Sequence, residues 1–301
     1  MQPRRSFYSV IISQSFLIPI VPIYVAFRTL LWYIVRSFSG GDCMICGYPI
    51  WMVFLMGCGV FLASFVDAIG GGGGLISLPT YLICGLPMHQ ALGTGKLSSC
   101  LGTSASTFRY IQNKCVDWKL GLPSIPLALI GAYFGTSLQL SLDEKYLKYL
   151  LIIILPIVAA VMFKQKNFRE ERGNIPFGKQ SAIVWTAAFI LGAYDGFYGP
   201  GSGTFMLLCF CTLAKMDLRS ASGNVKIVNF SSNVGALVTS LIAGTVLIPI
   251  GLITAVFAFA GHYIGAGLTI KNGTKIVRPI ILVVLSLLML KLVLEFCGVK
   301  L

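Results

Sequence analysis

The feature that most constrains this chain is a succession of apolar stretches, each close to the length of a membrane-spanning helix. A helix needs about 20 mostly apolar residues to cross the hydrocarbon core of a bilayer, and fewer where it is broken. Ten such stretches lie at about 50–69, 72–87, 90–112, 119–140, 146–163, 180–197, 201–214, 220–243, 246–269 and 276–297. We therefore expect an all-α, polytopic membrane protein.

The composition supports this expectation. Charged residues make up only 11% of the chain, whereas soluble domains carry about 25%. The net charge of +13 raises the question of a nucleic-acid partner. However, the lysines and arginines lie in short gaps between apolar stretches and form no single basic face. Basic gaps of this kind are typical of membrane topology signals, so the expected partner is the lipid bilayer and not nucleic acid.

Residues 1–48 form an N-terminal extension with an imperfect hydrophobic segment at about 7–35. Arg4 and Arg5 precede this segment, as in a signal peptide, but a compact apolar core with a small-residue cleavage site is missing. We expect the segment to be retained. Cys43 and Cys46 form one C-x-x-C pair, which lacks the four ligands of a structural zinc site. A redox or disulfide role for the pair stays open.

The chain contains an internal repeat with an offset of 130 residues. Ala91–Lys96 matches Ala221–Lys226, and Gly131–Gly135 matches Gly261–Gly265. With one residue of slip, Gly72–Gly74 matches Gly201–Gly203. Three separated matches at one offset predict a tandem duplication of five apolar stretches. The predicted organisation is the extension, a first repeat (49–164), a basic loop (165–179) and a second repeat (180–301).

Five segments per repeat is an odd number, so the second copy should have inverted topology relative to the first. Alternating the gaps between two sides places thirteen lysines and arginines on one side and five on the other. The richer side should be cytoplasmic, including the basic loop at 164–179, and the membrane is expected to be the plasma membrane. Inverted repeats are a common plan of transporters, with the substrate site near the membrane midplane.

Two glycine runs, at 70–74 and 199–203, interrupt equivalent stretches of the two repeats. Each glycine costs a helix interior about 1 kcal/mol relative to alanine. We therefore expect broken or re-entrant helices, whose free N–H groups and positive helix ends suit an anion. Tight helix packing is the alternative role for such glycines. The substrate-binding candidates in these runs are Gly72, Gly73, Gly74, Gly201, Ser202 and Gly203.

Lys96 and Lys226 occupy equivalent positions inside apolar stretches. A charge at the centre of a membrane helix costs at least about 2.5–3.5 kcal/mol. Snorkelling to the interface is one explanation. The other is that the two lysines approach one anion site from opposite sides. Neutral hydrogen-bonding candidates lie near them: Thr94, Ser98, Ser99, Asn224, Asn229 and Asn233.

Two acids, Asp67 and Asp195, precede the glycine runs. An acid within a membrane is a functional candidate, here as a proton carrier or as the partner of a lysine. A helix cap or a structural ion pair is an equal alternative. Because the stretches hold few acids, a cation site is disfavoured.

Signals for an enzyme are weak. Gly93–Leu97 resembles part of a phosphate-binding loop, but Gln90 and Leu97 replace its required glycine and hydroxyl residue. The two histidines, His89 and His262, suggest neither a metal cluster nor a catalytic triad. We expect no enzymatic activity, no metal and no cofactor.

The segment Asp67-Ala-Ile-Gly-Gly-Gly-Gly-Gly-Leu-Ile, followed by Ala91-Leu-Gly-Thr-Gly-Lys96, resembles the first half of the TauE/SafE family of membrane permeases. Tyr194-Asp-Gly-Phe-Tyr-Gly-Pro-Gly-Ser-Gly203 and Asn229-Phe-Ser-Ser-Asn-Val-Gly235 resemble its second half. The resemblance covers about 50–297. The sequence departs from close relatives in having Thr94-Gly95 where they often carry Thr-Asn.

The resemblance implies a transporter for sulfite, sulfonates or related sulfur-containing or organic anions. It places the site at the glycine runs and the neighbouring polar helix positions. We therefore predict a secondary transporter for a small anion, coupled to protons and working by alternating access between the repeats. A passive anion channel is the alternative. The sequence sets neither the anion, the direction of transport nor the oligomeric state.

Overall fold

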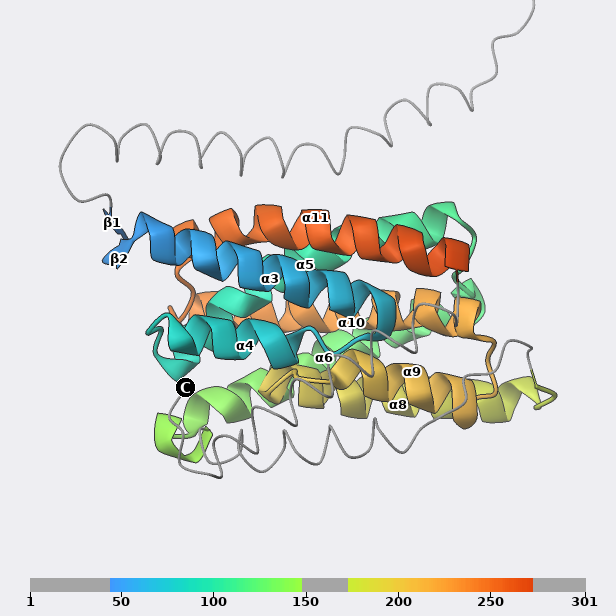
Figure 1. Cartoon of the computed structure of the whole chain (residues 1–301). Helices are drawn as coiled ribbons and strands as arrows, with labels where there is room; N and C mark the ends of the chain where they lie inside the picture. Colours follow the sequence, from blue (N-terminus) through green and yellow to red (C-terminus); the bar gives the residue numbers. More distant parts are fainter. Residues whose placement is uncertain (1–43, 148–172, 273–301) are drawn as a thin grey trace, which may run out of the picture.

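The computed structural model describes residues 44–147 and 173–272 (Figure 1). The predicted segment at 7–35, Cys43, most of the stretch at 146–163 and the stretch at 276–297 lie outside these ranges. The helices are α3 (Ile50–Gly70), α4 (Gly74–Ile83), α5 (Met88–Gln112), α6 (Trp118–Ser141), α8 (Phe177–Phe197), α9 (Ser202–Thr212), α10 (Leu218–Ile242) and α11 (Ile248–Asn272). We call α3–α6 the first half and α8–α11 the second half.

The helical prediction is confirmed with one small exception. Just before α3, the two-residue strands β1 (Met44–Ile45) and β2 (Tyr48–Pro49) pair as an antiparallel hairpin. The hairpin turns through Cys46 and Gly47, both with positive φ. Apolar periodicity could not predict this hairpin, because its strands are too short to show an alternating pattern.

Four helices in the described ranges are long and apolar enough to cross a membrane: α3, α6, α10 and α11. By contrast, α4 and α9 have only 10 and 11 residues. At about 1.5 Å per residue, such helices reach roughly half way across a hydrocarbon core of about 30 Å. The two shortest helices therefore end or begin inside the bundle.

Both short helices follow the glycine runs. Helix α3 ends at Gly70, and Gly71 and Gly72 adopt φ of 73° and 102° before α4 begins. In the second half, Gly199 and Gly201 have φ of 90° and 80° between α8 and α9. L side chains avoid this region, so glycine allows the chain to turn back. Figure 1 shows α4 and α9 starting near the middle of the bundle and running to opposite ends.

The helices pack in two corresponding sets of contacts. Helix α6 packs on α8 and α10, while α11 packs on α3 and α5. At the repeat offset, α6 corresponds to α11, α8 to α3 and α10 to α5. The same arrangement therefore occurs twice, and every one of these contacts joins one half of the chain to the other. The two halves form one interlocked bundle.

The repeated Gly-x-x-x-Gly motifs make these crossings close. A Cβ on Gly131 or Gly135 would overlap backbone atoms of α8. A Cβ on Gly261 or Gly265 would lie only 2.5 Å from backbone oxygens of α3. Small residues let membrane helices approach backbone to backbone. The sequence match between the motifs therefore has the same packing cause in both halves.

The outer surface and the interior have the composition expected for a protein in lipid. Large apolar side chains are exposed along the outer helices, among them Trp51, Phe54, Leu62, Leu122, Ile130, Leu138 and Ile190. The interior instead buries many hydroxyl and amide groups, especially on α5 and α10. An apolar exterior around an apolar core that also holds a band of polar groups fits a multi-pass protein with a polar site at its centre.

Candidate functional site

Two buried ion pairs lie at the centre of the bundle, and each joins one half to the other. Lys226 Nζ on α10 lies 2.8 Å from Asp67 Oδ2 on α3. Lys96 Nζ on α5 lies 3.0 Å from Asp195 Oδ2 on α8. We call them the Asp67 pair and the Asp195 pair. The two lysines are related by the repeat offset, so the two pairs are equivalent. In each pair, the lysine of one half binds the aspartate of the other half.

Each lysine also donates to the main-chain carbonyl of its aspartate. Asp67 and Asp195 both lie in the last turn of a helix that ends at a glycine run. The carbonyls of a last turn carry the negative end of the helix dipole, which stabilises a nearby cation. The breaks therefore create two lysine-binding positions from backbone as well as side chains.

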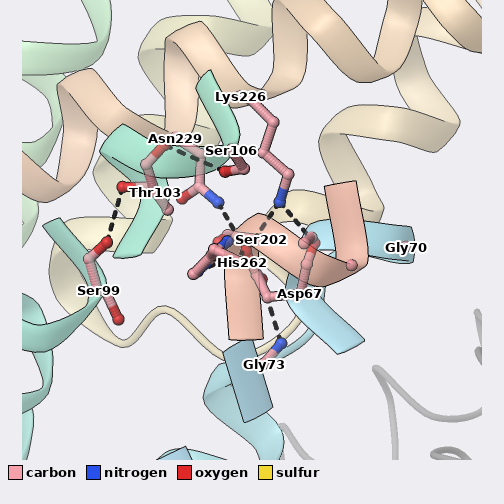
Figure 2. A network of polar contacts seen from close by, with 12 residues as sticks. Asp67, Gly70, Gly73, Ser99, Thr103, Ser106, Ser202, Lys226, Asn229 and His262 are labelled. Carbon is pink, nitrogen blue, oxygen red and sulfur yellow. Dashed lines mark hydrogen bonds and ion pairs between the residues drawn. The ribbon is translucent and has the colours of Figure 1, made fainter. Parts of the chain in front are cut away.

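The Asp67 carboxylate has few short hydrogen bonds besides that of Lys226. Gly73 N donates to Oδ1 over 3.2 Å, and Asn229 Nδ2 lies 3.5 Å from Oδ2. His262 Nε2, on α11, lies 3.8 Å from the same oxygen. Figure 2 shows Asp67 between Lys226 and Gly73, with His262 and Asn229 beside it.

The Asp195 carboxylate is held more tightly. Ser202 Oγ donates to Oδ1 over 2.6 Å, and Ser232 Oγ donates to Oδ2 over 2.7 Å. Lys96 adds a contact of 3.3 Å to Asn233 Oδ1. Asp195 is also the less accessible acid, with a side chain 5% exposed compared with 14% for Asp67.

The two helix breaks pack directly against each other. Thr204 Oγ1 on α9 donates to Gly70 O over 2.8 Å. A Cβ on Gly71 would overlap the backbone at Gly203 and Thr204, and one on Gly74 would meet Pro200. The N-terminal ends of α4 and α9 therefore lie side by side at the centre, and the positive ends of two helix dipoles meet there.

A cavity of about 60 Å³ opens beside the breaks. One water needs roughly 10–15 Å³ of such space, so the cavity can hold a few waters or one compact ion. It extends along α4 and the N-terminal part of α5, where Ser77, Tyr81 and Gly95 line it. Asp67, Asp195 and Lys96 all reach it, so it contacts both pairs.

Most of the predicted site residues gather around this cavity. The lining includes Asp67, Gly73, Gly74, Lys96, Asp195, Ser202, Asn229 and Asn233. Gly72, Gly201 and Gly203 form the adjoining breaks, and Lys226 is buried against Asp67, with its side chain 3% exposed.

Three predicted residues lie elsewhere in the described ranges. Thr94 accepts a hydrogen bond from Leu247 N at the start of α11. Ser98 contacts the Tyr81 hydroxyl and the carbonyl of Gly95. Asn224 faces Gly121 on α6. The structure therefore does not bring these three side chains to the cavity.

The structure adds residues that sequence reasoning did not place in the site: Thr103, Ser232 and His262, together with Tyr81 on α4. A helical signal could have found some of them. Lys96, Ser99 and Thr103 follow an i, i+3, i+7 spacing, and so do Lys226, Asn229 and Asn233. Residues at this spacing share one face of a helix, and all of these except Lys226 line the cavity.

Comparison with known families identifies a match over most of the chain. A family model described as "Sulfite exporter TauE/SafE" matches residues 55–292, which include every described helix except the first turns of α3. Similar proteins include the "Probable membrane transporter protein ORF9" of Sinorhizobium sp, 34% identical over 234 residues, covering 77% of this chain and 88% of the relative.

Two further relatives carry comparable names. The "Probable membrane transporter protein YfcA" of Escherichia coli K12 is 32% identical over 238 residues, covering 79% of this chain and 88% of its own. A "Probable membrane transporter protein" of Haemophilus influenzae is 31% identical over 245 residues, which cover 80% of this chain and 94% of the relative. These names describe transporters and not enzymes. No solved structure matches the chain.

Proposed function

The chain belongs to the TauE/SafE family of membrane transporters, and from this premise we propose that it is a secondary transporter of a small anion, coupled to protons. The substrate class would be a sulfur-containing or organic anion such as sulfite or a sulfonate. The observation that carries the proposal is the cavity where the N-terminal ends of α4 and α9 meet between the two ion pairs. Its size favours a compact anion over a bulky one.

The preference of the cavity for an anion comes mainly from the helix ends, because neither lysine is unpaired. Both lysines are paired with carboxylates, so the two pairs together are neutral. The adjoining starts of α4 and α9 add partial positive charge and N–H groups, as at anion sites on helix N-termini. The Ser99 hydroxyl and the Asn229 amide group supply neutral donors in the cavity wall.

The ion pairs give a physical route for proton coupling. Protonation of an aspartate removes its negative charge and leaves its lysine free to bind an anion. A proton and a monovalent anion then enter together without adding net charge to the buried site. Because a net charge in a low-dielectric interior is costly, the anion and the proton would favour each other's binding.

We further propose that the halves have inverted topology and alternate in exposing the site. The corresponding helix contacts and the exchanged pairs support this arrangement. Ser77 and Tyr81 of α4 line the cavity, whereas the corresponding residues of α9, Met206 and Phe210, do not. The opposite state would open the α9 side and close the α4 side.

The charges at the helix ends support an orientation in the cell membrane. Arg109, Lys114, Lys215 and Lys271 lie at the end of the bundle opposite the β1–β2 hairpin, where α5 and α11 end and α10 begins (Figure 1). Lys145 lies at the hairpin end. The richer end would be cytoplasmic, with the basic loop at 164–179. The cavity on the α4 side would then face outward.

The proposal can be tested in two steps. First, purified protein is heated with sulfite, sulfate, thiosulfate, ethanesulfonate and acetate, since a ligand of the folded state raises its thermal stability. Second, uptake of the stabilising anion is measured in proteoliposomes. Lys96→Gln should abolish uptake, while Lys145→Gln, a change at an exposed lysine, should leave it intact. Wild-type uptake by Lys96→Gln would refute the proposed site.

The same vesicles separate a transporter from a passive anion channel. An imposed inward proton gradient should drive accumulation of the anion above its external concentration, corrected for membrane potential. A channel cannot concentrate its ion against its own electrochemical gradient. Equilibration without accumulation would therefore favour the channel.

A further inference from the structure

The two ion pairs differ in one titratable neighbour. His262 lies beside Asp67, with Nε2 3.8 Å from Oδ2. At the repeat offset the counterpart of His262 is Ala132, which packs against Gly196 beside Asp195. The duplication therefore supplies both halves with an aspartate and a lysine, but only the Asp67 pair has a histidine.

His262 is placed as a group that can exchange a proton with the cavity. Its ring is 2% exposed and forms part of the cavity lining. Its Nδ1 atom has no hydrogen-bond partner in the described part of the chain. A buried polar atom without a partner costs about 1–3 kcal/mol. An apolar residue would avoid this cost, so the position has a use beyond packing.

Three helices contact the ring or the acid beside it, and two of them present charged groups. Helix α3 presents Asp67, and α10 presents Lys226. Helix α5 presents Gly102, whose missing side chain leaves room for the ring. Arg109, near the C-terminal end of α5, donates to Tyr263 O. Across the cavity, Lys96 and Asp195 neutralise each other. The ring therefore faces one acid and one lysine directly.

The hydrogen bonds also differ between the two aspartates, and Asp67 is the less strongly hydrogen-bonded of the two. Asp195 receives two short serine hydroxyl bonds in addition to Lys96, and these stabilise the ionised carboxylate. Asp67 has longer bonds from Gly73 and Asn229 and greater access to the cavity. A proton arriving from cavity water would therefore meet Asp67 and His262 as the less satisfied acceptors.

We propose that Asp67 and His262 together form the proton-binding site of the transporter, while Asp195 keeps its ion pair with Lys96. The inference rests on the proposed function and assigns its coupling step to one pair. One proton passes from cavity water to the carboxylate or the imidazole, and the group of Asp67, His262 and Lys226 gains one positive charge. That charge matches one monovalent anion in the cavity.

The test compares the two histidines of the chain. His262→Gln keeps a polar side chain that cannot titrate, and His89→Gln is the control. His89 contacts Gln139 over 2.6 Å and is not among the cavity-lining residues. Proteoliposomes are assayed with radiolabelled sulfite, ethanesulfonate and acetate, both for counterflow at equal pH and for accumulation driven by a proton gradient.

We expect His262→Gln to reduce gradient-driven accumulation far more than counterflow at equal pH, and His89→Gln to retain both. Wild-type accumulation by His262→Gln would overturn the inference while leaving the proposed function standing. Absence of both activities from the wild-type protein, with all three probes, would remove the proposed function and the inference with it.

A second measurement does not depend on a folded or active His262 variant. In His89→Gln protein, His262 is the remaining histidine, so a ¹⁵N-histidine label reports on its ring alone. We expect the ring signals to titrate, to change when the transported anion binds, and to shift their midpoint in Asp67→Asn but not in Asp195→Asn. A ring that responds neither to pH nor to the anion would refute the inference.

Discussion

The Asp67 pair and the Asp195 pair share a framework and differ in their surroundings. In both, a lysine from the middle of a long helix reaches an aspartate in the last turn before a glycine break. Around Asp195, Ser202 and Ser232 complete a set of short hydrogen bonds. Around Asp67, the corresponding space holds His262 and longer contacts.

Some features of the site are common to the two halves, and others occur in one half alone. The glycine breaks, the lysines and the close helix crossings occur in both halves and build the bundle. The serines beside Asp195 and the histidine beside Asp67 are the differences on which the proposed proton-binding site depends. The following substitutions test that difference, in order of expected effect.

The largest effect should come from removing a lysine. Lys226→Met leaves the Asp67 carboxylate without its cation, and breaking a buried pair in this way costs about 3–5 kcal/mol of stability. Lys96→Met should cost less, because Ser202 and Ser232 still donate to Asp195. Thermal unfolding in one detergent measures both. Adding Asp67→Leu to Lys226→Met should recover most of the loss. An equal cost for the two lysines would contradict the proposed difference.

A smaller effect is expected from a serine beside Asp195. Ser232→Ala removes a 2.7 Å bond to the carboxylate, and hydrogen bonds to charged groups contribute about 1.5–3 kcal/mol. The neighbouring Ser231→Ala is the control, since that hydroxyl bonds to Ile227 O within its own helix. Ser232→Ala should therefore unfold at a lower temperature than Ser231→Ala. If they unfold together, Ser232 does not stabilise the charge.

The smallest effect concerns the contact between the two breaks. Thr204→Val removes the bond from α9 to Gly70 O and should cost about 0.5–1.5 kcal/mol. Thr212→Val is the matched control, because the Thr212 hydroxyl bonds to Leu208 O within its own helix, α9. Proteolysis near the breaks should increase in Thr204→Val and remain unchanged in Thr212→Val. Similar behaviour of the two variants would argue that the breaks are held by packing alone.

Most of the helical framework could be predicted from the sequence. Each described helix starts and ends within a few residues of a predicted apolar stretch, because the membrane requires long apolar runs and glycine interrupts them. The repeat also identified Lys96 and Lys226 as equivalent. It did not identify their partners, because an offset within the sequence does not say which half a side chain reaches.

Of the polar residues predicted near the lysines, Ser99, Asn229 and Asn233 line the cavity, whereas Thr94 and Ser98 do not, for a geometric reason. Thr94 and Ser98 are close to Lys96 in sequence, but they lie on other faces of α5, whereas Ser99 and Thr103 share its face. Nearness along the chain was therefore a poorer guide than helical spacing. His262 was overlooked for a different reason. It lies far from Asp67 in sequence, and its only signal was a histidine where the other repeat has Ala132.

The exchange of lysines between halves has a consequence for how such a chain can originate. A single five-segment unit carries an aspartate and a lysine that cannot complete one another, since each needs its counterpart from another copy. In the proposed topology that copy lies upside down. An ancestor of half this length would therefore have required two copies inserted in opposite directions. Fusion into one chain ensures that each molecule contains one copy in each orientation. It also allows the two copies to diverge, as at Ala132 and His262.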